Sequence, residues 1–352
     1  MGILSYAGGL GLISLTVYIM VIGRDLMVPF MISVVIWYLI NILSDYYHKI
    51  TLGKWQVPVM MSYIASLLTI ALILNFLIGM ISSNIVEVKQ AAPLYQENFI
   101  RLTTKIFHLV GIEKEPSFAQ VIHQVNLTPF ITNLAGTLAA LVGSASLILI
   151  YVLFLMLEQK YFKVKLARLL EGSSHKEMVY NIIEHISGDV KTYIGVKTFV
   201  SALTGGACYL VLVSVGVNNA SFWAFFIFLL NFIPTVGSML AVLFPSLLSL
   251  VQFDSFTPFL IVIISLVAIQ MTIGNILEPK LMGNSLNLSP LVVMLSLALW
   301  GSIWGIAGMF LSVPFTVILM IIFSQFPKTK PIAILLSQDG NIRPRDSIMV
   351  AD

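Results

Sequence analysis

The sequence predicts an all-α membrane protein, a polytopic helical bundle with about eight apolar segments. Hydrophobic residues make up 58% of the 352-residue chain, charged residues make up only 10%, and the mean hydropathy is +0.97. A soluble domain carries roughly 25% charged residues and could not bury this much apolar surface. Apolar runs of about 20 residues, the length that crosses a hydrocarbon core, recur along most of the chain. One membrane-embedded body is therefore expected.

The apolar runs give the order of the expected spans. No Lys or Arg precedes the first run and a second run follows at once, so we interpret it as a retained helix and not a signal peptide. The expected segments cover residues 3–22, 26–44, 57–82, 134–157, 195–217, 222–251, 258–277 and 289–325. They divide the chain into N-terminal membrane helices (1–82), an extracytoplasmic amphipathic segment (83–133), a membrane helix (134–157), a cytoplasmic basic amphipathic segment (158–194), a C-terminal membrane core with broken helices (195–325) and a cytoplasmic tail (326–352).

The distribution of basic residues predicts the orientation, because cytoplasmic loops of membrane proteins are enriched in Lys and Arg. Two stretches are rich in them, one before the fifth span and one in the tail. They contain Lys160, Lys163, Lys165, Arg168, Lys176, Lys191 and Lys197, and then Lys328, Lys330, Arg343 and Arg345. Counting spans from these stretches places both termini in the cytoplasm and residues 83–130 outside.

Two stretches between spans have helical periodicity. In the outer segment, apolar residues recur at three-four spacing over 99–109, and Ser117 with Gln120 forms a capping box before a second apolar stripe. In the inner segment, Ser174 and Glu177 match a capping box and an apolar stripe follows. We expect short amphipathic helices in both segments, lying against the membrane face or a neighbouring subunit.

The long run 222–251 has a break in its middle. Pro234 has no N–H to donate and disfavours helix at the preceding residue, and Gly237 permits a turn. Backbone groups freed inside a bilayer need protein, water or a solute as partners, which is how discontinuous helices become binding sites. The candidate residues for such a path are Asn231, Pro234, Thr235, Gly237 and Ser238.

The run 289–325 is too long for one simple span and is a candidate for a second broken element. Gly301, Gly305 and Gly308 lie at its centre, and Pro314 follows. The same glycines would equally let neighbouring helices approach closely. Each long run is either a re-entrant hairpin or a pair of complete crossings. Both alternatives leave the tail in the cytoplasm, but they place Glu278 on opposite faces of the membrane.

A polar stripe ends the run 258–277. Gln270, Gly274 and Glu278 fall at four-residue spacing on one helix face, and Asn275 lies three residues before Glu278. We therefore add these four residues to the candidate transport path.

The position of Glu278 before a proline sets its expected environment. Pro279 disfavours helix at Glu278, so the helix is expected to end there and to place the carboxylate at the negative end of the helix dipole. A bound cation or a proton would relieve this unfavourable placement. The structural alternative is an ion pair with Lys280 that closes the helix end.

Several function classes lack their sequence signatures. The chain has no His-Glu-x-x-His motif, no nucleophile elbow and no phosphate-binding loop, so we expect neither an enzyme nor a cofactor. Cys208 is the only cysteine, and the histidines at 48, 108, 123, 175 and 185 lie outside the spans, so no metal site is expected. The net charge of +3 with clustered basic residues gives no indication of nucleic-acid binding.

Three stretches carry a resemblance to a known family. They are Asn231-Phe232-Ile233-Pro234 with Gly237-Ser238, Gly274-Asn275-Ile276-Leu277-Glu278-Pro279-Lys280 with Gly283, and Leu311-Ser312-Val313-Pro314. Together they resemble the autoinducer-2 exporter (AI-2E) family of bacterial permeases. The likeness covers nearly the whole chain and is strongest from Tyr193 to Ile322.

The resemblance implies a multi-pass transporter of the bacterial cytoplasmic membrane that forms a homo-oligomer. Pro279, Lys280, Gly283 and Pro314 belong to its structural motifs. Some family members are associated with export of the signal autoinducer-2 and others with exchange of sodium or lithium for protons. The expected partners are therefore membrane lipid, other copies of the chain, and a small polar solute or a monovalent cation with protons.

Three functional hypotheses follow. The first is secondary export of a small polar solute such as autoinducer-2, with the hydrogen-bonding groups around Pro234 and Gln270 as the path. The second is sodium or lithium/proton antiport, with Glu278 as the exchanging carboxylate. The third is a non-transporting membrane scaffold whose amphipathic helices recruit partners, although a scaffold has no need of an interrupted helix.

Overall fold

The computed structural model describes residues 3–52, 55–76, 78–80, 97, 136, 143–253, 255–283 and 287–341. Within these ranges the regular structure is helical, apart from a short antiparallel pair of strands, β1 (Thr51–Leu52) and β2 (Trp55–Gln56), and an isolated bridge between Leu288 and Ser337. Six described helices are long and apolar enough to cross a membrane. These observations confirm the all-α polytopic bundle. The outer amphipathic helices predicted within 83–133 fall outside the described residues, apart from position 97.

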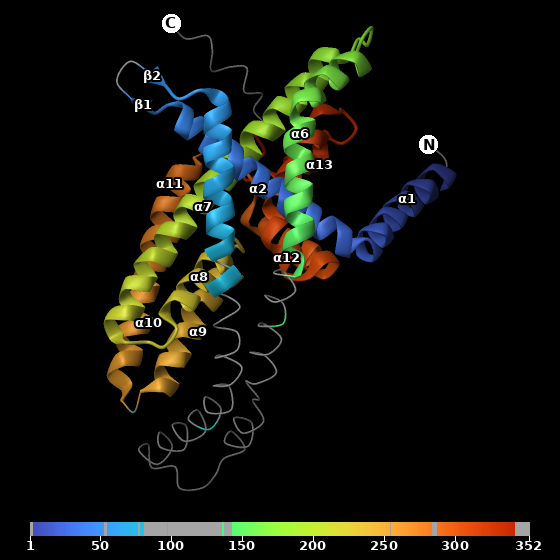
Figure 1. The fold of residues 1–352 in the computed structure, drawn as a ribbon. Coiled ribbons are helices and arrows are strands. Elements are labelled where there is room, and N and C mark those ends of the chain that lie inside the picture. The colour runs from blue at the N-terminus through green and yellow to red at the C-terminus, as the bar shows by residue number, and fades with distance from the viewer. Residues whose placement is uncertain are drawn as a thin grey trace, which may run out of the picture. The chain divides into compact units, whose positions relative to one another are not determined.

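The helices follow the predicted order along the chain (Figure 1). They are α1 (Ile3–Ile22), α2 (Arg24–His48), the helix Val59–Met80, α6 (Ala145–Leu169), α7 (Lys176–Val215), α8 (Ala220–Leu230), α9 (Val236–Gln252), α10 (Phe256–Thr272), the π-helical turn η1 (Ile273–Leu277), α11 (Glu278–Met282), α12 (Pro290–Gln325) and α13 (Lys330–Leu336). The chain forms two compact units. Unit 1 consists of Met1–Gln56, Leu147–Lys197 and Lys280–Asp352, and unit 2 consists of Val57–Ser146 and Thr198–Pro279.

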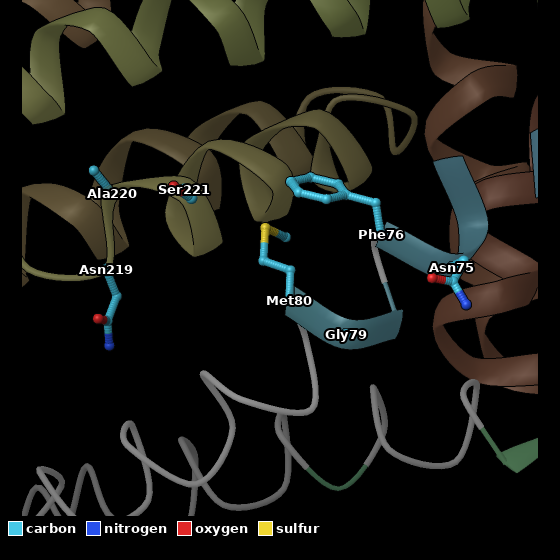
Figure 2. A pocket seen from close by; sticks show the side chains of 7 residues that line it. All are labelled: Asn75, Phe76, Gly79, Met80, Asn219, Ala220 and Ser221. Atoms are coloured by element: carbon cyan, nitrogen blue, oxygen red, sulfur yellow. The ribbon is translucent and has the colours of Figure 1, made fainter. Parts of the chain in front are cut away.

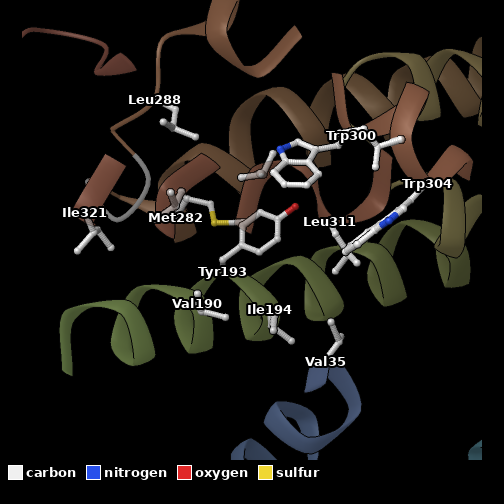
Figure 3. Close-up of a cluster of buried hydrophobic side chains, with 13 residues drawn as sticks. Val35, Val190, Tyr193, Ile194, Met282, Leu288, Trp300, Trp304, Leu311 and Ile321 are labelled. Atoms are coloured by element: carbon white, nitrogen blue, oxygen red, sulfur yellow. The ribbon is translucent and has the colours of Figure 1, made fainter. Parts of the chain in front are cut away.

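The core of unit 1 forms around two tryptophans of α12. The Trp300 ring lies 4.4 Å from the Phe315 ring, centroid to centroid, and the Trp304 indole N–H donates to the Met20 carbonyl at 2.9 Å. Figure 3 shows Tyr193 of α7 beside Met282 in the same cluster. The buried members are Val35, Val190, Tyr193, Ile194, Met282, Leu288, Trp300, Ile303, Trp304, Leu311, Val313, Val317 and Ile321. Residues from α2, α7 and α12 thus share one apolar interior.

The break predicted in the run 289–325 is confirmed at Gly305. This residue has φ 61° and ψ −138°, a conformation that only glycine adopts without strain. Beyond Gly305 the chain folds back on itself. The close approach is seen at Gly308, where an added Cβ would lie only 1.9 Å from the Trp300 carbonyl oxygen. Pro314 is buried in the second half. The first half, 290–304, is about 22 Å long and therefore shorter than the roughly 30 Å hydrocarbon core.

The inner amphipathic helix differs from its prediction. It begins at Lys176 and continues without interruption into the membrane span as the 40-residue helix α7. No proline interrupts this stretch, so the helix has no reason to end before the membrane. At its start, the Ser173 hydroxyl accepts the His175 N–H, so the predicted capping by Ser174 is wrong. Lys197, counted among the cytoplasmic basic residues, is buried with 5% exposure.

The α12 hairpin gives a stability prediction. Gly308→Ala should lower the free energy of unfolding by at least about 2 kcal/mol, because the new Cβ would overlap the Trp300 carbonyl. Gly206→Ala in α7 is the control: no atom lies within 4 Å of its Cβ position, and alanine should stabilise the helix by about 0.5–1 kcal/mol. Thermal unfolding of detergent-solubilised protein measures both, and equal stability of the two variants would contradict the tight turn.

Candidate functional site

The first long interrupted run forms a helical hairpin in unit 2. The helix α8 has 11 residues and α9 has 17, and the five residues between them form turns. Figure 1 shows α8, α9 and α10 side by side, and α9 contacts both of its neighbours. At about 1.5 Å per residue, α8 is only about 16 Å long and cannot cross a bilayer alone. The predicted break around Pro234 is therefore confirmed, and its geometry is that of a re-entrant hairpin.

The tip of this hairpin contains strained and close-packed backbone. Thr235 has φ 58° and ψ −62°, and the Val236 N–H donates to the Pro234 carbonyl at 2.6 Å, which together define a γ-turn. This turn is rare and costs about 1–3 kcal/mol for a residue other than glycine. A Cβ on Gly237 would lie 1.8 Å from the Leu230 carbonyl oxygen. The chain thus reverses at Thr235 only because residue 237 has no side chain.

The backbone at the tip is less polar than the sequence suggests. The N–H groups of Phe232 and Ile233 donate to the carbonyls of Leu229 and Leu230, and the Gly237 N–H donates to the Ile233 carbonyl. Several peptide groups that a broken helix would free are therefore paired within the turn. The polar character of the hairpin rests on its side chains more than on exposed backbone.

A buried side-chain network crosses from the hairpin to its neighbours. Asn231, which is 2% exposed, caps the C-terminus of α8. Its amide N–H donates to the Ser201 hydroxyl of α7 at 3.1 Å, and its carbonyl oxygen accepts the Gln270 amide N–H of α10 at 3.2 Å. These three side chains form what we call the amide network. It carries both donors and acceptors and contains no ionised group.

The end of α10 corrects the prediction for Glu278. The helix does not end there, because the π-helical turn η1 leads into α11, and Glu278 has helical dihedral angles of φ −58° and ψ −50°. Its N–H donates to the Ile273 carbonyl, five residues back. A proline ring clashes with the carbonyl four residues before it in a regular α-helix, and the wider π-turn accommodates Pro279 instead of ending the helix.

The π-turn keeps the predicted polar stripe on one face. Glu278 lies eight residues after Gln270, but the π-turn contains one extra residue. Glu278 therefore has the angular position of the seventh residue after Gln270 in an α-helix, about 20° from Gln270 around the helix axis. The Gln270 side chain also lies against Gly274, because its amide nitrogen is 2.9 Å from the position that a Cβ on Gly274 would occupy. Glu278 is half-buried, whereas Asn275 is exposed and does not take part in the amide network.

The remaining candidates occupy separate places. Thr235 is exposed, and the Ser238 hydroxyl donates to its carbonyl at 2.8 Å. Pro279 and Lys280 are exposed, and Gly283 ends α11 with φ 54°. Sequence reasoning missed Ser201, because one serine in an apolar run carries no signal until its partner across the fold is known.

A cavity of about 730 Å³ lies at the other end of α8 (Figure 2). Phe76 and Met80, from the helix Val59–Met80, line one side. Asn219 and Ser221, at the start of α8, contribute polar groups to the other side. The hairpin therefore has polar groups at both ends of its first helix. Within the described ranges, no group of three metal-ligating side chains is present.

The chain is similar over most of its length to known transport proteins. The sequence model described as AI-2E family transporter matches residues 10–328. The chain is 30% identical to the AI-2 transport protein TqsA of Escherichia coli K12 over 325 residues, 90% of each chain. It is 31% identical to a putative transport protein of Haemophilus influenzae over 327 residues, covering 90% of this chain and 91% of that one. A putative transport protein of Borreliella burgdorferi is 32% identical over 249 residues, 69% of this chain and 67% of its own.

The amide network gives a matched stability prediction in unit 2. Ser201 and Ser249 are both fully buried, but only Ser201 accepts a bond from another helix, whereas Ser249 donates to the Ser246 carbonyl of its own helix at 2.7 Å. Ser201→Ala should lower the free energy of unfolding by about 1–2 kcal/mol, and Ser249→Ala by less than about 0.5 kcal/mol. Denaturant titration in detergent tests this difference, and equal losses would show that the network adds nothing.

Proposed function

Because the chain belongs to the AI-2E family of membrane transporters, we propose that it exports a small polar organic solute, such as autoinducer-2, by secondary transport. The single observation that carries the proposal is the amide network at the tip of the re-entrant hairpin. Discontinuous helices that end inside the bilayer are typical of transporter binding sites. Family membership also argues against the scaffold hypothesis.

The chemistry of the amide network favours an uncharged solute. Asn231 and Gln270 each carry two amide N–H donors and a carbonyl acceptor, which suits hydroxyl and carbonyl groups. An ion would have to lose its hydration shell at a site whose three side chains supply no opposite charge, and this desolvation is costly. A hydroxylated solute exchanges its bonds to water for bonds to these amides and avoids that cost.

We place the protein in a bacterial cytoplasmic membrane with both termini in the cytoplasm. The basic stretches support this orientation, because Lys160, Lys163 and Lys165 of α6 follow its apolar part and are exposed. In this topology the α8–α9 hairpin enters from outside and the α12 hairpin from the cytoplasm. Glu278 then lies toward the cytoplasmic side. Exposed apolar side chains on α2, α6 and the helix Val59–Met80 would face lipid or other copies of the chain.

Solute efflux tests the proposal directly. Proteoliposomes loaded with labelled autoinducer-2 should release it faster than protein-free vesicles. Gln270→Leu should slow release more than tenfold, because it removes the amide on α10 and leaves the side chain's bulk. Thr272→Val is the control, since its hydroxyl bonds only the Ala268 carbonyl of its own helix and is exposed. Release no faster than from empty vesicles would refute export of this solute.

Cation/proton antiport is the second candidate, and the π-turn that aligns Glu278 with Gln270 favours it. Such turns occur frequently at functional sites, and a half-buried carboxylate can bind a proton and a cation alternately. Under antiport, a pH dye inside proteoliposomes should report proton flux driven by a sodium or lithium gradient. Glu278→Gln should abolish this flux while leaving solute efflux measurable. No flux in the wild type with any cation would exclude antiport.

A further inference from the structure

Two buried polar atoms of unit 2 have no hydrogen-bond partner among the residues that the structure describes. They are the hydroxyl oxygen of Thr198 in α7 and the indole nitrogen of Trp223 in α8. Trp223 is only 7% exposed. Its ring packs edge-on against those of Phe222 and Phe226, at centroid distances of 5.4 Å and 6.0 Å respectively. Buried donors without partners are rare and costly, so each calls for a partner that the described residues do not supply.

Thr198 differs from three buried hydroxyls elsewhere in the helices of this unit. Thr204, Ser246 and Ser249 each donate to a carbonyl three or four residues earlier in their own helix. This local bond normally satisfies a buried hydroxyl in a membrane helix. The Thr198 hydroxyl does not make it, and its donor and its acceptor sites both remain available.

The two atoms flank the amide network from opposite ends. Ser201 of α7 bonds Asn231 of α8, and the Cβ position of Gly205 lies 2.9 Å from the Ala224 carbonyl, so the two helices run antiparallel. Thr198, one turn before Ser201, is therefore level with the tip of the hairpin. Trp223 lies two turns before Asn231, toward the start of α8.

We propose that Thr198 and Trp223 are solute-binding residues, and that they select an uncharged, oxygen-rich solute along α8. An indole N–H is a donor only, so Trp223 can bind a hydroxyl, ether or carbonyl oxygen but can never coordinate a metal cation. Thr198 offers a donor and an acceptor at the tip. This inference rests on the proposed export function and specifies two further groups that contact the solute.

Conservative variants separate recognition from packing. Thr198→Val and Trp223→Phe remove the unpaired atoms and keep most of the shape. Each should raise the half-saturating concentration of autoinducer-2 or ribose in proteoliposome transport about fivefold, since one neutral hydrogen bond is lost. Thr198→Val should leave the unfolding temperature in solute-free detergent unchanged, because no existing bond is broken. Trp223→Phe should lower it only by the loss of ring packing, and therefore by no more than Trp304→Phe does.

The controls remove polar atoms that are already bonded. Thr204→Val loses a bond to the Val200 carbonyl, and Trp304→Phe loses the bond to the Met20 carbonyl. Both should leave the half-saturating concentration unchanged, and Trp304→Phe should lower the unfolding temperature. Transport that is equally tight in Thr198→Val, Trp223→Phe and the wild type would overturn the inference and leave the export proposal standing.

A wild type that moves neither solute would refute export, and ligand-induced stabilisation then decides the inference separately. Autoinducer-2 or ribose should raise the unfolding temperature of the purified wild type, and the rise should be absent in Thr198→Val and Trp223→Phe. Absence of any rise in the wild type would overturn the inference. A rise with sodium chloride alone that both variants lose would overturn it as well, because the indole cannot hold a cation.

Discussion

A backbone that reverses direction inside hydrocarbon must bond its own peptide groups, because no water is present there to do so. The α8–α9 hairpin pairs several of its own peptide groups in this way, and both hairpins of this chain bring a carbonyl close to a glycine. In unit 2 the Leu230 carbonyl lies over Gly237, and in unit 1 the Trp300 carbonyl lies over Gly308. The rest of each unit depends on these reversals, since they bring the halves of each long apolar run together.

The reversal in unit 2 also determines where polar side chains can be used. Because the turn pairs several of its own N–H groups, Asn231 is free to bond outward to α7 and α10. An unpaired amide at this depth would be costly, and its two partners offset that cost without introducing a charge. Unit 2 thus keeps a polar interior in a bilayer by distributing it over three helices.

The sequence predicted both helix breaks, because proline and glycine act locally on the backbone. Pro234 breaks a helix because it has no N–H to donate, and Gly305 does so because a residue without a Cβ can adopt a positive φ. The prediction for Glu278 failed because a proline near the end of an apolar run normally indicates the end of a helix. In the structure, the wider π-turn lets the helix continue past Glu278. Ser201 could not be found, because its role depends on the register of two helices about 30 residues apart in the chain.

The two glycine positions have a consequence for how such a transporter can change. A side chain at Gly237 or Gly308 would overlap a carbonyl at the turn, so mutation at these sites destabilises the hairpin. Ser201, Asn231 and Gln270 carry no such backbone constraint. On the proposed function, exchange of these side chains changes the preferred solute, whereas the glycines at the hairpin tips accept no side chain without strain.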